Sequence, residues 1–404
     1  MIKRVLSTLF ILASLFAPIQ TGHAQASLQI EEVQISYEYG AQITFAARFS
    51  PTSNVQEAYL FFQAEGDSEA HSSFLALSQD GQSLYRYEVN TGLIRPFARV
   101  FFWYRVALVD GGVFDSPRYF FQYDDNRYPW QILEDERIRV HWYAGEPDFG
   151  QQAFDAAHVG LQSLENLIPV DPGSLPVDIF VYATGQDIED TLRLGGYAWD
   201  MGHVNPELGV VLVAVSPDEN ASSGLSSQIP HELAHAVLYR MSGSASASLP
   251  VWLSEGIASL AENGGVAGIS QEMIAANGND TLLTMEALCA AFPTDVSNAA
   301  LAYAQAASFT QYLREQYGPG GLLSLIESYA QGRTCEKGAR HALNQPLSQL
   351  DRHWRQAVLG EAASPVALAN LLPYTAIILL VFLFPLASLL ISLRKKKESK
   401  KHAE

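Results

Sequence analysis

The chain has 404 residues, of which 48% are hydrophobic and 17% charged, so it has room for two or three globular domains with sizeable cores. Its formal net charge is −18. A charge of this sign and size disfavours nucleic acid and anionic lipid surfaces as partners, because both are negatively charged.

The first 26 residues have the pattern of a secretory signal peptide. Lys3 and Arg4 precede an apolar run over residues 5–17, and small residues follow around Ala24. The run is too short for a comfortable membrane span. We therefore expect residues 1–26 to be removed, with an uncleaved anchor as the alternative.

Residues 27–125 are predicted to form an immunoglobulin- or fibronectin-like β-sandwich. About seven short strands in roughly 100 residues are typical of that fold. Segments rich in aromatic and β-branched residues recur between turn signals, at 28–37, 42–49, 58–63, 84–89, 100–109 and 118–123. The region contains no cluster of metal-ligating residues, which favours a spacer or binding module over a second catalytic unit.

Residues 130–360 are predicted to form an α+β domain. Strands at 138–143 and 177–182 flank a helix at 149–167, and a further strand at 208–215 completes a small mixed sheet. The remainder is predicted to be helical, at 285–292, 300–317, 321–330 and 347–358. Ser242 to Ser248 is predicted to be a loop, which could cover a cleft as a flap.

The strongest candidate site begins with His231, Glu232 and His235. Two histidines four residues apart lie on one face of a helix and can bind one metal ion, while the glutamate reaches a water on that metal. The serines before Pro230 are N-cap candidates, and Pro230 is expected in the first turn of the helix. By itself the pattern arises by chance in roughly one chain in a hundred of this length, so it needs supporting context. The alternative is an ordinary helix with two surface or core histidines.

Glu255 supplies that context. It lies on a second predicted helix, from Pro250 to Glu262, and its carboxylate would complete a three-ligand Zn²⁺ set with a fourth position open for water. A capping or solvated carboxylate is the alternative for Glu255. Glu262 lies seven residues later on the same helix face, where it would support a ligand histidine or remain solvated.

Together, His231, Glu232, His235 and Glu255 resemble the HExxH-plus-distal-glutamate pattern of the gluzincin metallopeptidases. Residues 252–262 look like the glutamate helix of the peptidase MA-like group and of M1-type aminopeptidases. The resemblance covers about residues 130–360 and implies a thermolysin-like zincin domain. No Gly-x-Met-Glu-Asn segment is present, which argues against an M1-type exopeptidase.

This resemblance also implies roles for individual residues. Glu232 would be the general base, and Tyr303, which follows the glutamate helix where such families often place a tyrosine, is the candidate for stabilising the oxyanion. A packing tyrosine is the alternative for Tyr303. The strand at 208–215 is expected to be an edge strand that pairs with the extended backbone of a substrate.

The sequence thus predicts a metallopeptidase with one zinc ion per chain, acting on peptide or protein substrates and more consistent with an endopeptidase. The alternative is a catalytically inactive, peptidase-like surface protein used for binding or as a scaffold. Retention of all four expected residues argues against this alternative.

Two features remain outside the site. Cys289 and Cys335 lack CxxC spacing, so they form a disulfide if they are close in space, or stay as two free thiols. Residues 369–393 are predicted to form a transmembrane helix, because no charged residue occurs between Glu361 and Arg394. The basic tail at 394–404 would be cytoplasmic. We therefore expect a single-pass protein of the cell membrane, in contact with the lipid bilayer through this helix, with its N-terminal ectodomain outside the cytoplasm.

Overall fold

A computed structural model describes most of the chain between residues 27 and 360, in the ranges 27–89, 94–169, 176–194, 204–205, 207–262 and 264–360. The predicted signal peptide, transmembrane helix and basic tail lie outside these residues. The chain divides into two compact units. Unit 1 comprises the chain up to Ile94 together with Ala98–Tyr123, and unit 2 comprises Arg95–Phe97 and the chain from Asp124 onward.

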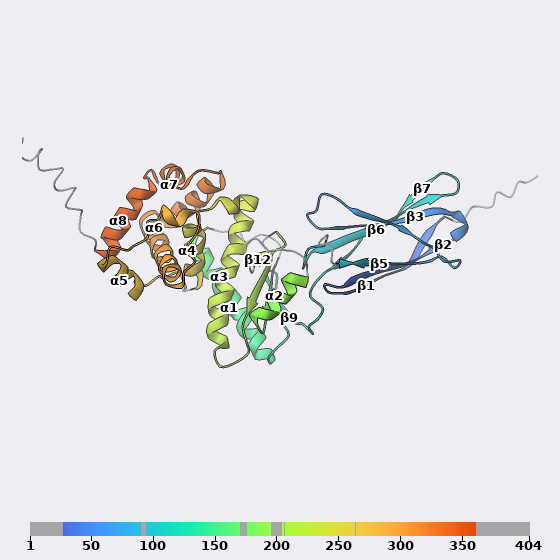
Figure 1. The fold of residues 1–404 in the computed structure, drawn as a ribbon, viewed down its shortest axis with the longest axis horizontal. Coiled ribbons are helices and arrows are strands. Elements are labelled where there is room, and N and C mark those ends of the chain that lie inside the picture. The colour runs from blue at the N-terminus through green and yellow to red at the C-terminus, as the bar shows by residue number, and fades with distance from the viewer. Residues whose placement is uncertain are drawn as a thin grey trace, which may run out of the picture. The chain divides into compact units, whose positions relative to one another are not determined.

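Unit 1 is a β-sandwich-like structure of two antiparallel sheets, drawn mainly in blue in Figure 1. One sheet has the strand order β1-β2-β5, and the other has the order β4-β3-β6-β7, with β8 also paired to β6. The strands are β1 (Gln29–Glu38), β2 (Gln42–Ser50), β3 (Val55–Ala64), β4 (His71–Leu75), β5 (Gln82–Glu88), β6 (Arg99–Leu108), β7 (Val113–Asp115) and β8 (Tyr119–Gln122), with a short 3-10 helix at Thr52–Asn54.

The core of unit 1 follows from the alternation of side chains along each strand. Every second residue of β2 and β6 is buried, which is the period expected when one face of a strand packs against a partner sheet. Phe45 from β2 contacts Phe62 from β3 and Phe102 from β6, each with ring centroids 5.3 Å apart. These aromatic contacts between the sheets explain why the aromatic-rich segments of the sequence form a sandwich core.

Unit 2 contains a mixed five-stranded sheet with the order β12-β13-β11-β10-β9. The three inner strands run parallel to one another, and the two outer strands are antiparallel to their neighbours. The strands are β9 (Gln131–Glu134), β10 (Ile138–Trp142), β11 (Val177–Tyr182), β12 (Val204–Asn205) and β13 (Val210–Ala214).

The position of β13 corrects the prediction of an edge strand at 208–215. β13 pairs with β12 on one side and β11 on the other, so β12 is the outer strand. Four consecutive residues of β13 are buried. A continuous apolar run of this kind is typical of an inner strand covered on both faces, whereas a half-exposed edge strand would alternate.

The helices of unit 2 pack around this sheet and continue beyond it toward the C-terminus; Figure 1 draws α1 and α2 in green and the later helices in yellow to red. They are α1 (Pro147–Leu167), α2 (Gly185–Leu194), α3 (Ala221–Ser242), α4 (Val251–Glu262), α5 (Gln271–Gly278), α6 (Val296–Ala330), α7 (Cys335–Leu343) and α8 (Leu347–Leu359), with 3-10 turns η3 (Gly243–Ser248) and η4 (Ala287–Cys289).

Two of the predicted helices are joined in α6, which kinks at Gly318 before Pro319. Gly318 has φ 70°, a left-handed conformation that glycine adopts without strain. The helix predicted at 285–292 is reduced to η4, and the loop predicted at 242–248 is the 3-10 turn η3.

No helix in the described part of the chain is long and apolar enough to cross a membrane. On this finding the predicted fold class, which included a C-terminal transmembrane helix, and the predicted single-pass localisation are wrong. The described structure is β-sandwich-like at its N-terminal end and helical toward its C-terminal end. The long helices are polar on one side: α1 exposes Gln151 and Asp155, and α6 exposes Glu315 and Gln316.

Cys289 and Cys335 form a disulfide, with their Cα atoms 6.3 Å apart. The bridge joins η4 to the first residue of α7. This resolves the choice between a disulfide and two free thiols that the sequence left open.

Candidate metal centre

Helix α3 carries His231, Glu232 and His235, and it begins earlier than the sequence suggested. Its N-cap is Asn220, so Pro230 lies inside the helix instead of in its first turn. Proline has no N–H to donate to the carbonyl four residues earlier, so one helical hydrogen bond is absent there. Helix α1 packs closely against this turn at Gly160, where a Cβ would lie 2.8 Å from the Cα of Pro230.

Helix α4 carries Glu255 and crosses α3 so that the carboxylate faces the two histidines. The approach of α4 to α6 depends on the next residue, Gly256. A Cβ at Gly256 would lie 2.2 Å from Oγ1 of Thr310 and 2.6 Å from the carbonyl oxygen of Ala306. Only glycine allows the two helix backbones to pack at this separation.

The structure brings the three predicted metal ligands together. One ligand atom from each of His231, His235 and Glu255 lies within 4.8 Å of the others. Nε2 of His231 is 3.4 Å from Oε2 of Glu255, and Nε2 of His235 is 3.6 Å from Oε1 of the same carboxylate. Ligands bonded to a tetrahedral zinc ion at ~2.05 Å are separated by ~3.3 Å, and the two histidine–carboxylate distances are close to this value. Two imidazoles and one carboxylate are also a donor set that Zn²⁺ takes.

The charge state of the cluster also fits a cation. Burial would lower the pKa of His231, but hydrogen bonds to the carboxylates of Glu255 and Glu262 outweigh it and raise the pKa to about 9. Burial lowers the pKa of His235 to about 4, so this imidazole is neutral, the form that binds metal. Burial opposes ionisation of Glu255, yet its interactions with the two histidines, led by the hydrogen bond to His231, leave its pKa below the usual value. Binding of a metal dication would release the proton that these carboxylates hold on His231.

Glu232 completes the motif next to these ligands. Burial raises the pKa of Glu232 to about 7; the negative charge of Glu255 acts in the same direction, and His231 opposes it. Its carboxyl is therefore close to the midpoint of its titration at neutral pH.

Residues 156–360 match the family model described as the peptidase MA superfamily. This chain belongs to the peptidase MA superfamily. The match covers α3, α4 and α6 with all of the residues discussed above, and it supports a peptidase that would act on peptide or protein substrates. The superfamily is typically zinc-dependent, in agreement with the donor set of this member.

The other comparisons add no functional argument for this peptidase MA member. No curated protein matches it. Among solved structures, it is similar to a purple acid phosphatase from yellow lupin seeds at 11% identity and a TM-score of 0.21, covering 50% of this chain and 40% of that one. The alignment with a polysaccharide deacetylase from Bacillus cereus (8% identity, TM-score 0.20) covers 47% of this chain and 63% of the deacetylase. The alignment with a β-glucuronidase from Bifidobacterium dentium (9% identity, TM-score 0.18) covers 54% of this chain and 34% of the glucuronidase. The chain spans less than two thirds of each of these structures, and the TM-scores are too low to relate the folds.

Further side chains of the peptidase MA region orient the two histidines. Oε2 of Glu262 is 3.6 Å from Nδ1 of His231, and the hydroxyl of Ser227 donates to Oε1 of the same glutamate at 2.6 Å. On the other histidine, Nδ1 of His235 lies 3.1 Å from Oγ of Ser254. When Nδ1 donates to Ser254, the lone pair of Nε2 faces Glu255 and the shared centre, which is the orientation a metal ligand needs.

Sequence reasoning had considered Glu262 for this position but had not identified Ser227 or Ser254. Ser254 could have been noticed because it directly precedes Glu255 on the same helix. Ser227 lies one turn before His231, on the face that meets Glu262, and only the packing of α3 against α4 makes this contact visible.

Tyr303 lies on α6 at the open side of the cluster. Its side chain is 41% exposed, and its ring centroid is 6.4 Å from that of His231. Burial and the charges of Glu255 and Glu232 raise the pKa of its phenol, so the hydroxyl keeps its proton. Phe292 packs edge-on against Tyr303 with centroids 5.0 Å apart.

Other histidines of the described chain have ordinary partners. Nε2 of His141 is 2.8 Å from Oδ1 of Asp178, and Nε2 of His158 is 3.1 Å from Oδ2 of Asp135. His203, which precedes the strand before α3, lies outside the described residues. Within the described ranges, His231, His235 and Glu255 form the only group of three side chains that could hold a metal ion.

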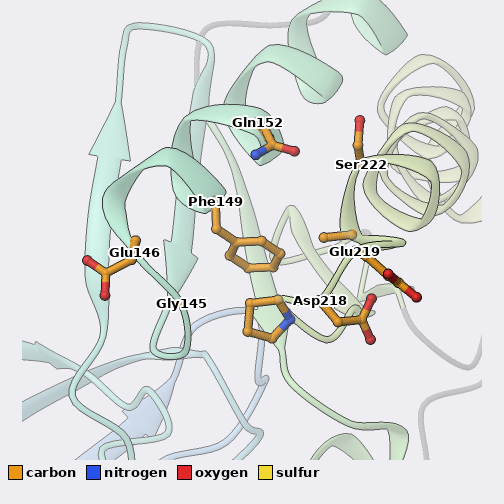
Figure 2. A pocket seen from close by; sticks show the side chains of 9 residues that line it. Gly145, Glu146, Phe149, Gln152, Asp218, Glu219 and Ser222 are labelled. Carbon is orange, nitrogen blue, oxygen red and sulfur yellow. The ribbon is translucent and has the colours of Figure 1, made fainter.

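A separate cavity of about 430 Å³ lies at the N-terminal ends of α1 and α3 (Figure 2). Phe149 lies between two loops, one carrying Gly145 and Glu146 and the other carrying Asp218. Ser222, which lines the cavity, is nine positions before His231 on α3, a separation of about 13 Å along the helix axis. None of the residues that line the cavity belongs to the candidate metal centre.

Proposed function

We propose that the protein is a zinc metallopeptidase that hydrolyses peptide bonds, with His231, His235 and Glu255 as the metal ligands. The observation that carries this proposal is the convergence of two imidazoles and one carboxylate within 4.8 Å of one another, with Glu232 beside the first histidine. Membership of the peptidase MA superfamily gives independent support.

The side chains have distinct tasks in this reaction. Bound zinc would polarise the scissile carbonyl group and make a water molecule acidic enough to attack it at neutral pH. Glu232 takes a proton from the attacking water on its carboxylate and passes it to the nitrogen of the leaving amine.

Tyr303 donates its hydroxyl hydrogen to the carbonyl oxygen of the substrate as negative charge develops there. Its position beside His231 and its raised pKa support this role, because a protonated phenol is the donor required. Glu262 and Ser254 hold the rings of His231 and His235, so that the imidazoles do not rotate when the substrate enters.

The experiment that tests this function starts with the purified full chain, its zinc content and mass-spectrometric profiling of a broad peptide library. We expect one zinc ion per chain and cleavage that a chelator abolishes. Glu232→Gln should retain zinc and lose about 10²–10⁴-fold in cleavage rate, and Tyr303→Phe should lose about 10²–10³-fold. Glu219→Gln, the same chemical change at an exposed residue before α3, is the matched control and should cleave as wild type does.

Two results would overturn the proposal: the absence of stoichiometric zinc, or a Glu232→Gln variant that cleaves the library as well as wild type. The first result would favour an inactive, peptidase-like binding protein. We also propose an endopeptidase, because no segment for holding a free amino terminus was recognised in the sequence. Peptides blocked at both ends should then be cleaved, and cleavage of unblocked peptides alone would identify an exopeptidase.

A further inference from the structure

The Cys289–Cys335 disulfide lies directly against the helix that carries Glu255. Nε1 of Trp252, on α4, points at Sγ of Cys335 from 3.5 Å. Trp252 is completely buried, and it lies one helical turn before Glu255 on the same helix. If the disulfide moves, the contact with Trp252 transmits the movement to α4. Trp252 is only three residues from Glu255, the proposed metal ligand.

The surroundings of Trp252 leave it little freedom to adjust. Its ring packs edge-on against Phe309 with centroids 5.0 Å apart, and against Tyr329 at 6.4 Å. The hydroxyl of Tyr329 donates to the carbonyl oxygen of Cys335 at 2.9 Å. Tyr329 also has no space to shift toward α7, since a Cβ at Gly338 would lie 2.1 Å from its ring. The indole is thus enclosed by the disulfide on one side and by α6 on the other.

A second connection runs from the other half of the disulfide. Cys289 ends η4, and the chain that leaves it carries Phe292, which packs against Tyr303 with centroids 5.0 Å apart. Tyr303 in turn lies 6.4 Å from the ring of His231. The disulfide therefore holds both the helix beneath the metal centre and the segment beside it.

We infer that the Cys289–Cys335 disulfide, acting through Trp252, positions Glu255, so that the affinity of the site for zinc depends on whether the disulfide is formed. This inference rests on the proposed function. Trp252 is a positioning residue: it contacts neither metal nor substrate, and it acts by fixing the rotation and depth of α4.

The chemical step in question is reduction of the disulfide. A phosphine reductant supplies two electrons, breaks the S–S bond and is oxidised to its phosphine oxide, with one water molecule providing the oxygen and the two thiol protons. The two freed segments, η4 and the start of α7, are then no longer joined, and Trp252 loses the fixed surface on its sulfur side. We expect zinc affinity to fall roughly tenfold, the lower end of the effect of removing groups that orient a metal ligand.

The experiment uses the full chain and compares two tryptophans that are closely matched. Trp354 is also completely buried, packs on the same Phe309 with centroids 5.8 Å apart, and donates its Nε1 hydrogen to Ser308 at 3.2 Å. Trp354 lies on α8, which carries none of the proposed ligands. Trp252→Phe and Trp354→Phe thus remove the same atoms and one polar contact each, from two tryptophans that both pack on Phe309.

Zinc affinity is measured by chelator competition, and the free energy of unfolding by denaturant titration of the same samples. Trp252→Phe, the Cys289→Ser/Cys335→Ser double variant and phosphine-reduced wild type should each bind zinc about tenfold more weakly. Trp354→Phe should keep the wild-type affinity, even if it is as destabilised as Trp252→Phe. The serine variant is needed because free thiols can themselves bind zinc.

Equal zinc affinities for Trp252→Phe and Trp354→Phe would overturn the inference, as would a double serine variant with wild-type affinity. If the double variant does not fold, the comparison of the two tryptophan variants still decides the question. In each of these cases wild type still binds zinc and cleaves peptides, so the proposed function stands. A wild-type protein that binds no zinc would overturn both the proposed function and this inference.

Discussion

Gly256 provides the sharpest test of how the site is built. Changing Gly256 to alanine adds a Cβ that would lie 2.2 Å from Oγ1 of Thr310 and 2.6 Å from the carbonyl oxygen of Ala306. The first contact is with a small side chain, but the second is with the backbone of α6, which cannot move aside locally. Helix α4 must therefore shift away from α6 and carry Glu255 with it.

The magnitude follows from two opposing effects. Overpacking in a dense interior costs about 1–3 kcal/mol, and the backbone contact places this site near the upper end. Alanine in a helix is about 1 kcal/mol more favourable than glycine. The net loss is therefore ~2 kcal/mol in the free energy of unfolding, or about 4–8 °C in Tm for a unit of this size.

Denaturant unfolding and chelator competition measure the two expected consequences, lower stability and weaker zinc binding. Gly320→Ala on α6 is the control, because nothing lies within 4 Å of its Cβ position. It should be neutral or slightly stabilising. Thr310→Ala should be close to neutral alone, since its buried hydroxyl has no hydrogen-bond partner in the described structure. In the Gly256→Ala background it should restore part of the loss. A Gly256→Ala variant with wild-type unfolding and zinc affinity would refute this account of the α4–α6 packing.

Three further outcomes are expected. Glu262→Gln should weaken zinc binding by about 10–100-fold in chelator competition; unchanged affinity would mean that Glu262 does not orient His231. Removal of metal from wild type should lower the free energy of unfolding by about 2.7 kcal/mol relative to zinc at 100 times its Kd, and His231→Ala should show no such difference. Burial raises the pKa of Asp187, but hydroxyl hydrogen bonds, led by that of Thr184, outweigh it and leave the pKa below its usual value. Its contribution is therefore complete above about pH 4 and is lost as pH falls through the lowered pKa. The stability gap between wild type and Asp187→Asn should narrow between pH 7 and pH 3 in urea titrations, and a gap that is the same at both pH values would contradict this.

The grouping of His231, His235 and Glu255 could be anticipated because it depends mainly on local geometry. Residues four apart on a helix share a face, and turn signals delimit the helix that carries Glu255. The contacts of Ser227 and Ser254 could not be anticipated in the same way. They depend on the angle at which α3 and α4 cross, which no short segment of sequence determines.

Other differences arose where packing prevailed over a local rule. Pro230 suggested the start of a helix, yet α3 continues through it, with α1 packed closely against that turn at Gly160. The apolar run of β13 was assigned to an edge although its lack of alternation indicates an inner strand. The disulfide between Cys289 and Cys335 needed the tertiary structure, since 46 residues separate them.

Phe97 affects where the chain can be cut to obtain unit 2 as a separate fragment. It belongs to unit 2, where its ring lies 4.6 Å from that of Phe180 in a small buried cluster, although the sequence on both sides of Arg95–Phe97 belongs to unit 1. A fragment that starts at Asp124 therefore lacks a side chain from its own core. Unit 2 is not one continuous stretch of the sequence, and a fragment meant to fold as this unit has to include Arg95–Phe97.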